Sequence, residues 1–137
     1  MNENKIDFLN PKGIFDATAY GFSHTALVPA GGRLLFISGQ SGGVGESHEL
    51  SKEFSEQVKA TLNNIRITLD SHDAKPEHIV KITILIVDHN LEKLKIWTEH
   101  AQEFWSGHSL PTSTLIPVPQ LALEGMQIEV DAVAYLK

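Results

Sequence analysis

Cysteine is absent from the 137 residues of this chain. Its absence excludes disulfides, thiolate metal sites and cysteine nucleophiles, and it is compatible with a reducing cytosol. No segment approaches the roughly 18 consecutive apolar residues of a membrane-spanning helix. Residues 1–11 lack the basic start and the apolar run of a secretory signal. We therefore expect a cytoplasmic protein that has no membrane partner.

Basic charge is scarce as well. The 11 lysines and arginines are outnumbered by 17 aspartates and glutamates, and the formal net charge is −6. The only arginines are Arg33 and Arg66. Binding to nucleic acid needs a basic footprint, so we expect no nucleic-acid partner. The length and the 42% hydrophobic content predict one globular domain over residues 1–137.

Two stretches show the three- and four-residue apolar spacing of amphipathic helices. The first covers about residues 51–71, with Ser51 as its N-cap. The second covers about residues 91–107, with Asn90 as its N-cap and Gly107 as its stop. The predicted apolar stripes are Phe54, Val58, Leu62, Ile65 and Leu69 in the first helix, and Leu94, Trp97, Ala101, Phe104 and Trp105 in the second.

Alternating or β-branched segments predict five strands. They cover residues 25–28, 33–38, 78–88, 112–118 and 127–136. The Pro-Ala-Gly-Gly sequence between the first two segments predicts a hairpin turn.

The resulting order, β-β-α-β-α-β-β, predicts an α+β fold with both helices on one face of a mixed or mostly antiparallel sheet. The uncovered face combines apolar positions such as Leu85 and Val87 with the carboxylates of Glu129 and Asp131. Apolar residues on an open sheet face are usually buried against another subunit. We therefore expect an oligomer whose subunits meet through their sheets.

Several familiar chemical motifs are incomplete in this chain. The glycine-rich segment 39–45 lacks the Gly-Lys-Ser/Thr ending of a phosphate-binding loop. The seven histidines show no spacing typical of a metal site. Ser113 lacks the Gly-x-Ser-x-Gly elbow of a hydrolase nucleophile. We therefore expect no cofactor and no metal.

Glu129 and Asp131 stand two residues apart on the last predicted strand, so they point to the same face. If a neighbouring subunit closes that face, burial raises the pKa of a carboxyl group and favours a general base. Glu129 is then the leading candidate. If the face stays open, both are solvated carboxylates. The spacing leaves both interpretations open.

Five segments, taken together, resemble the reactive-intermediate deaminase family (RidA, also called YjgF or endoribonuclease L-PSP). Ser38-Gly39-Gln40 is similar to the S-G-Q turn that follows a strand in that family. Residues 57–64 fit its Q-x4-L-x-N helix pattern. The other segments are residues 80–83 as V-K-x-T, residues 111–114 at the P-A-R-S motif, and residues 127–134 as the closing strand. The resemblance extends in order over about residues 20–135.

The resemblance implies a chorismate-mutase-like α+β fold. It also implies a homotrimer whose sheets form a central barrel, with three clefts between subunits that bind a small-molecule ligand. Members of the family hydrolyse reactive enamines and imines to keto acids and ammonia.

The resemblance also implies roles for individual residues. Glu129 matches the glutamate that activates water, and Ser38-Gly39-Gln40 matches the turn that orients substrate. Ser113 stands where the family has the arginine that grips the substrate carboxylate, and a serine makes no bidentate charged fork. The remaining substrate-binding positions align with Phe22 in place of tyrosine, Thr98 in place of asparagine, and Leu115 in place of a cysteine whose backbone holds water.

Three functional classes follow. The first is a hydrolase or deaminase with Glu129 as base, which acts on a substrate without a free α-carboxylate or binds that carboxylate differently. The second is a non-catalytic small-molecule binder or sensor. The third is an endoribonuclease or a holdase, and the acidic charge disfavours the ribonuclease.

Overall fold

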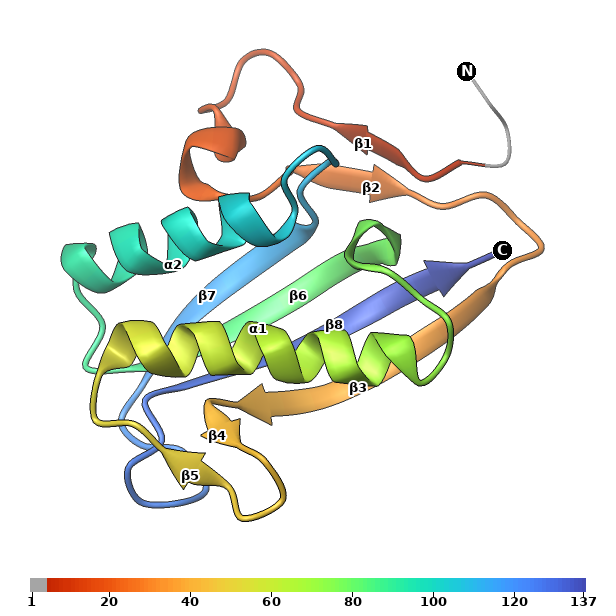
Figure 1. Ribbon diagram of the computed structural model, residues 1–137. Coiled ribbons are helices and arrows are strands. Elements are labelled where there is room, and N and C mark those ends of the chain that lie inside the picture. The colour runs from red at the N-terminus through yellow and green to blue at the C-terminus, as the bar shows by residue number, and fades with distance from the viewer. Residues whose placement is uncertain (1–4) are drawn as a thin grey trace.

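The computed structural model describes residues 5–137 and forms a four-stranded sheet with two helices on one face (Figure 1). The strand order is β3-β8-β6-β7. The parallel pair is β6–β7, whereas β3–β8 and β6–β8 are antiparallel. The strands are β3 (Arg33–Ser41), β6 (Ile79–Val87), β7 (Thr112–Val118) and β8 (Ile128–Leu136). The predicted mixed sheet is confirmed.

Helices α1 (Phe54–Asp70) and α2 (Leu91–Phe104) lie side by side in front of the sheet (Figure 1). Alternation along β6 and β8 turns one set of side chains toward the helices. That set forms the core with both helix stripes and includes Ile82, Ile84, Ile86, Ile128, Val130 and Ala132. The prediction that both helices cover the same face is therefore confirmed.

The start of α2 agrees with the prediction, whereas the helix ends at Phe104, three residues before the predicted stop Gly107. The start of α1 differs. Asn90 caps α2, because its Oδ1 accepts the Lys93 N–H at 2.8 Å. The predicted N-cap Ser51 is wrong, since α1 begins at Phe54 and Glu53 is its N-cap residue. Ser51 Oγ instead accepts the Glu53 N–H at 3.1 Å and closes a turn in front of the helix.

The predicted hairpin between residues 25–28 and 33–38 is also wrong. Strand β2 (Thr25–Leu27) pairs with β1 (Asp7–Leu9) in a separate two-stranded sheet. The reason lies just before β2, where the Ser23 N–H donates to the Pro111 carbonyl at 2.9 Å. That bond holds the start of β2 at the β7 edge, and β3 lies at the opposite edge. The intervening segment therefore crosses the molecule instead of making a tight turn.

Short elements surround the sheet. The 3-10 helix η1 (Ala17–Tyr20) precedes β2, and strands β4 (Gly43–Val44) and β5 (Glu49–Leu50) form a small hairpin after β3.

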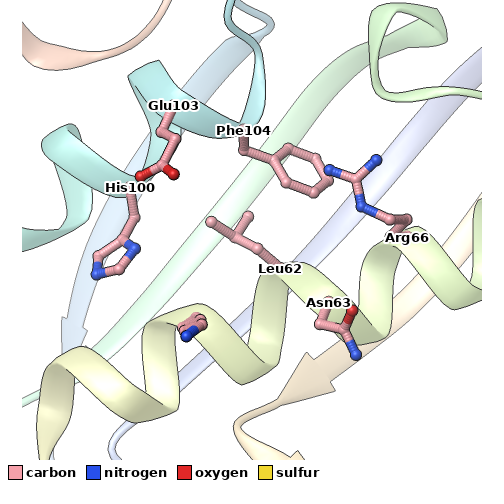
Figure 2. Close-up of a pocket in the computed structure, with 7 residues that line it drawn as sticks. Leu62, Asn63, Arg66, His100, Glu103 and Phe104 are labelled. Carbon is pink, nitrogen blue, oxygen red and sulfur yellow. The ribbon is translucent and has the colours of Figure 1, made fainter.

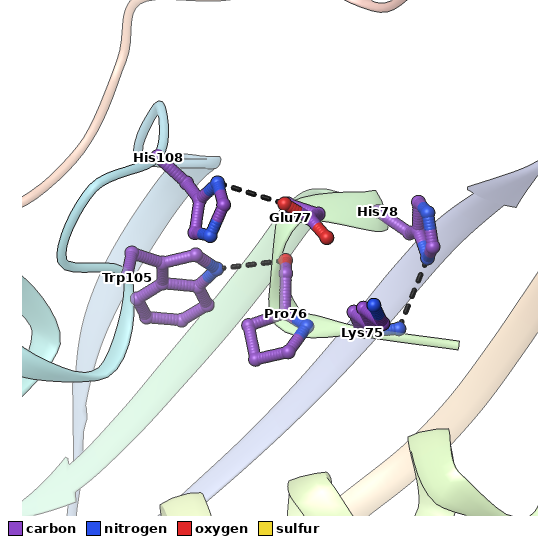
Figure 3. Close-up of polar contacts among 6 residues, drawn as sticks. All are labelled: Lys75, Pro76, Glu77, His78, Trp105 and His108. Carbon is purple, nitrogen blue, oxygen red and sulfur yellow. Dashed lines mark hydrogen bonds and ion pairs between the residues drawn. The ribbon is translucent and has the colours of Figure 1, made fainter. Parts of the chain in front are cut away.

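A second 3-10 helix, η2 (Pro76–His78), joins α1 to β6 and is anchored to the end of α2 (Figure 3). Trp105 Nε1 donates to the Pro76 carbonyl at 2.9 Å, and His108 Nδ1 lies 2.7 Å from Glu77 Oε2. These contacts tie the two helices together at the start of β6.

Gln57 is a fully buried amide in α1 that connects three segments. Its Nε2 donates to the carbonyls of Ser51 (2.7 Å) and Gly125 (2.9 Å), and its Oε1 accepts the Gln127 N–H at 2.9 Å. The loop before β8 is thereby fixed to the loop before α1.

Gln57→Ala is expected to lower the free energy of unfolding by roughly 2–4 kcal/mol, because it leaves buried backbone groups without partners. Urea denaturation followed by circular dichroism measures the change. Gln102→Ala is the matched control, since the exposed Gln102 makes one 3.2 Å bond to the Thr18 carbonyl. Equal stability of the two variants would contradict this role for Gln57.

Candidate functional site

Glu129 lies on the open face of the sheet, on the side away from the helices. It is the cross-strand partner of Leu85 on β6, and Asp131 is the partner of Thr83. Asp131 Oδ1 accepts the Thr83 N–H at 3.1 Å and is held against the sheet. Glu129 is half-buried and borders two adjoining depressions in the surface.

The close approach of Glu129 to β3 depends on a glycine. The β3–β8 register shifts between Ile37 and Gln40, so the irregularity contains Ser38 and Gly39. A Cβ atom at Gly39 would lie 2.5 Å from Glu129 Oε1. Only glycine therefore lets the carboxylate lie over the strand in this position.

A cavity of about 410 Å³ opens beside this carboxylate. Gly39, Gln40 and Glu129, three of the residues predicted for the site, line it together. Ser38 is exposed, and its carbonyl accepts a 3.1 Å bond from Gln40 Nε2. The wall also contains Ser41, His48 and Asn64, whose position sequence reasoning did not anticipate.

Asn64 holds the glycine-rich wall in place. It projects from α1, and its Nδ2 donates to the carbonyls of Ser41 (2.9 Å) and Gly43 (2.8 Å). The asparagine of the helix pattern thus fixes the loop that follows β3. The Q-x4-L-x-N pattern drew attention to Asn64, but nothing in the sequence indicated that its side chain binds the Ser41 and Gly43 carbonyls.

A second, smaller cavity of about 120 Å³ contains three other predicted residues, Phe22, Ser113 and Leu115. Ser113 and Leu115 on β7 pair with Ile82 and Ile84, so they face the helices. They line the cavity with Phe22, Tyr20, Ile84, Leu94 and Trp97. None of these lining residues carries a charge. Within residues 5–137, the wall of this cavity therefore offers no cation to pair with the carboxylate of a ligand.

Thr98 lies next to this cavity but does not line it. Its buried hydroxyl donates to the Tyr20 carbonyl at 3.3 Å. The contact holds the segment that contains Tyr20 and Phe22 against α2. The binding role predicted for Thr98 stays a prediction.

Several aromatic rings lie close together in residues 15–24, around η1 and before β2. Phe15 makes edge contacts with Tyr20, Phe22 and His24, with ring centroids 4.9–6.1 Å apart. Asp16 caps η1, and hydrogen bonds from the Thr18 hydroxyl and then the Thr18 N–H lower the pKa of its carboxyl group. This arrangement leaves Phe15 and Tyr20 exposed beside the smaller cavity.

The two cavities do not meet within one subunit. The Glu129 cavity involves β3 and β8, whereas Ser113 and Leu115 lie on β7 at the other edge of the sheet. Glu129 and Ser113 also point to opposite faces of the sheet, since Glu129 points away from the helices and Ser113 points toward them. One chain therefore presents two separated halves of the predicted site.

A groove of about 470 Å³ between α1 and α2 contains none of the predicted residues (Figure 2). Its side chains contact neighbours within the groove or beside it. The Arg66 guanidinium lies 4.6 Å from the Phe104 ring centroid, and His100 Nε2 lies 3.0 Å from Ser55 Oγ. We therefore regard the groove as a helix-packing feature.

Residues 5–137 contain no group of three or more His, Asp or Glu side chains arranged to hold a metal ion. Within the same range, no helix combines the length and the apolar character needed to cross a membrane.

Comparisons with known proteins identify the family and the fold. The profile of the endoribonuclease L-PSP family matches residues 16–136. A RutC family protein of Aquifex aeolicus is 35% identical over 101 residues, which are 73% of this chain and 78% of the relative. The structure of a Rid family protein of Yersinia pestis, YyfB, described as of unknown function, superposes with a TM-score of 0.90. It is 26% identical and covers 96% of this chain and 98% of its own.

Another similar structure is that of Escherichia coli TdcF with bound serine, at a TM-score of 0.65. It is 20% identical and covers 83% of this chain and 92% of its own. At that identity the similarity concerns the fold. The α+β fold of the RidA and YjgF proteins is thus present in this chain.

Proposed function

The chain belongs to the endoribonuclease L-PSP family, the family of RidA and YjgF, and from this membership we propose that it hydrolyses an enamine or imine to a carbonyl compound and ammonia. The observation that carries the proposal is the Glu129 carboxylate, held over Gly39 at the wall of a cavity. A carboxylate in that position can take a proton from a water molecule.

The reaction would take place in a cleft between subunits of a homotrimer. Large apolar side chains on the open sheet face support this assembly, since Phe36 is 73% exposed and Leu34 is 55% exposed. Exposed apolar patches of this kind mark interaction surfaces. The separation of the Glu129 and Ser113 cavities within one subunit gives independent support, because a neighbouring copy can supply the missing half.

The proposed chemistry has two steps. Glu129 removes a proton from water while the water oxygen bonds to the imine carbon, the C=N electron pair moves to nitrogen, and the nitrogen takes a proton from an acidic group or from solvent. Protonated Glu129 then gives its proton to the nitrogen of the carbinolamine, and ammonia leaves as the C–N bond breaks and the hydroxyl group returns its proton to that acidic group or to solvent, forming the C=O bond. No metal or cofactor takes part in this scheme.

The substrate is proposed to lack the free carboxylate of a standard 2-imino acid. The Ser113 cavity is lined by apolar and hydroxyl side chains, and its described wall carries no charge. Burial of a carboxylate without a cationic partner is unfavourable, whereas a neutral or aromatic group suits Phe22, Leu94 and Trp97. By the resemblance of residues 111–114 to the P-A-R-S motif, Ser113 corresponds to the arginine of the family.

Ammonia release tests the proposal. Imines are generated in the assay by an amine oxidase, for substrates without a carboxylate, or by an amino-acid oxidase, for 2-imino acids. An arginine-containing family member serves as the positive control. We expect faster release from the carboxylate-free imines. The absence of acceleration with both classes would favour a non-catalytic binder or sensor, which the small uncharged cavity also suits.

Ser113→Arg is expected to reverse this preference. A new charge-assisted bond to a carboxylate contributes about 1.5–3 kcal/mol, so kcat/KM for 2-imino acids should rise roughly 10- to 100-fold. Ser113→Gln is the control of similar length without a charge. If both substitutions act alike, the preference does not depend on the charge at this position.

A further inference from the structure

His48 occupies an unusual backbone position beside the Glu129 cavity. It lies between β4 and β5 with a φ of +57°, in the left-handed region that few residues other than glycine adopt, histidine, asparagine and aspartate more often than the rest. Its ring covers Gly43, where a Cβ atom would lie 2.0 Å from His48 Cδ2. Residues other than glycine in this backbone region cluster at active sites and ligand clamps.

The ring is directed at a serine. His48 Nε2 is hydrogen-bonded to Ser41 Oγ, and the same oxygen accepts the Gly43 N–H at 3.2 Å. The backbone amide can only donate, so it occupies one acceptor position of the hydroxyl and leaves the hydroxyl proton free for exchange with the imidazole. Asn64 fixes both carbonyls of this turn.

Ser41 and His48 share their cavity with Glu129. Ser41 is the cross-strand partner of Glu129, and all three residues line the same cavity. Glu129 and His48 are the titratable side chains of the described cavity wall. The carboxylates nearest in sequence, Glu46 and Glu49, are exposed and lie outside the wall. The cavity therefore combines one acidic group and one imidazole.

We propose that His48 is a second acid–base residue of this site and acts on the substrate nitrogen through the Ser41 hydroxyl. This inference rests on the proposed imine hydrolysis. Histidine suits the role because its side chain changes charge near neutral pH. In the addition step, Glu129 would take a proton from water while His48 supplies a proton to the nitrogen through Ser41. In the second step the two residues exchange these roles.

The protons balance over the two steps. As the water oxygen bonds to carbon, Glu129 takes a water proton, and the C=N electron pair moves to nitrogen. The nitrogen takes the Ser41 hydroxyl proton, which protonated His48 replaces. Protonated Glu129 then gives its proton to nitrogen as the C–N bond breaks, and the carbinol proton returns through Ser41 to His48. Ammonia and the carbonyl compound leave, and both residues regain their starting protonation.

The test replaces His48 with glycine, which adopts the left-handed conformation without strain and should preserve the turn. We expect His48→Gly to lower kcat at least about a hundredfold with little change in KM. The fall in rate at high pH, where histidine loses its proton, should disappear. Imidazole added to the solution should restore activity to His48→Gly, but not to Ser41→Ala, which lacks the relay. His72→Gly, at an exposed histidine after α1, is the matched control and should keep the wild-type pH profile.

The possible failures are distinguishable. Wild-type rate and pH profile in a folded His48→Gly variant would overturn the role of His48 and leave the proposed hydrolysis intact. A loss of activity that imidazole does not restore, with an unchanged pH profile, would make His48 a structural residue of the turn and would also overturn the inference. A wild-type protein without imine hydrolysis would remove both proposals.

Discussion

Glu129→Gln is expected to reduce kcat for ammonia release by roughly 10²- to 10⁴-fold, the usual contribution of a general base. Glutamine has nearly the same shape and fits over Gly39 as glutamate does, but its amide takes no proton from water. Initial rates under saturating imine measure the effect. Thermal unfolding and gel filtration should give wild-type values, because Glu129 is half-buried and outside the helix-facing core.

Asp131→Asn is the matched control for this experiment. Asp131 is a carboxylate on the same strand and face, and its Oδ1 accepts the Thr83 N–H, a bond that the asparagine oxygen can also accept. This variant should keep most of the activity. A fully active Glu129→Gln variant would instead identify Glu129 as a surface carboxylate, the second interpretation that its spacing allows.

The sheet and helices could be predicted from the sequence where burial imposes a period. Ile82, Ile84 and Ile86 alternate because one face of β6 packs against both helices, and Asn90 begins α2 because its side chain caps the free N–H groups. These patterns involve neighbours along the chain. The pairing of β2 with β1 is decided by the distant bond from Ser23 to Pro111, which no local pattern encodes.

The candidate site likewise combines residues whose positions follow from local sequence patterns with residues whose positions depend on distant contacts. The position of Glu129 on the open face follows from strand alternation, and its proximity to Gly39 agrees with the resemblance of the Ser38-Gly39-Gln40 turn. His48 carries no local signal, since its proximity to Ser41 arises from a left-handed turn between two-residue strands. Ser113 and Glu129 both belong to the predicted site, yet sheet order separates them within one chain. Sequence spacing specifies the faces of the strands but not which strands lie next to one another.

Phe36→Asp should therefore disrupt the proposed trimer and the activity together. Phe36 lies on the open face opposite Val133 and is 73% exposed in the single subunit. In the trimer its burial would contribute about 1.5–3 kcal/mol per copy, and an unpaired aspartate there would be strongly unfavourable. Across three copies we expect the assembly to weaken at least about a thousandfold. Light scattering during gel filtration at several concentrations measures the mass of the species.

Ile67→Asp is the corresponding control, because Ile67 is 58% exposed on α1, away from the open sheet face. It should remain as large as the wild-type protein. The Phe36→Asp subunit should keep its circular dichroism spectrum, since Phe36 lies outside the helix-facing core. Loss of ammonia release in this folded monomer would mean that the Glu129 and Ser113 cavities act only when two copies bring them together. Undiminished activity in a monomer would show that the Glu129 cavity suffices for the reaction, and an intact trimer would show that the subunits meet through another surface.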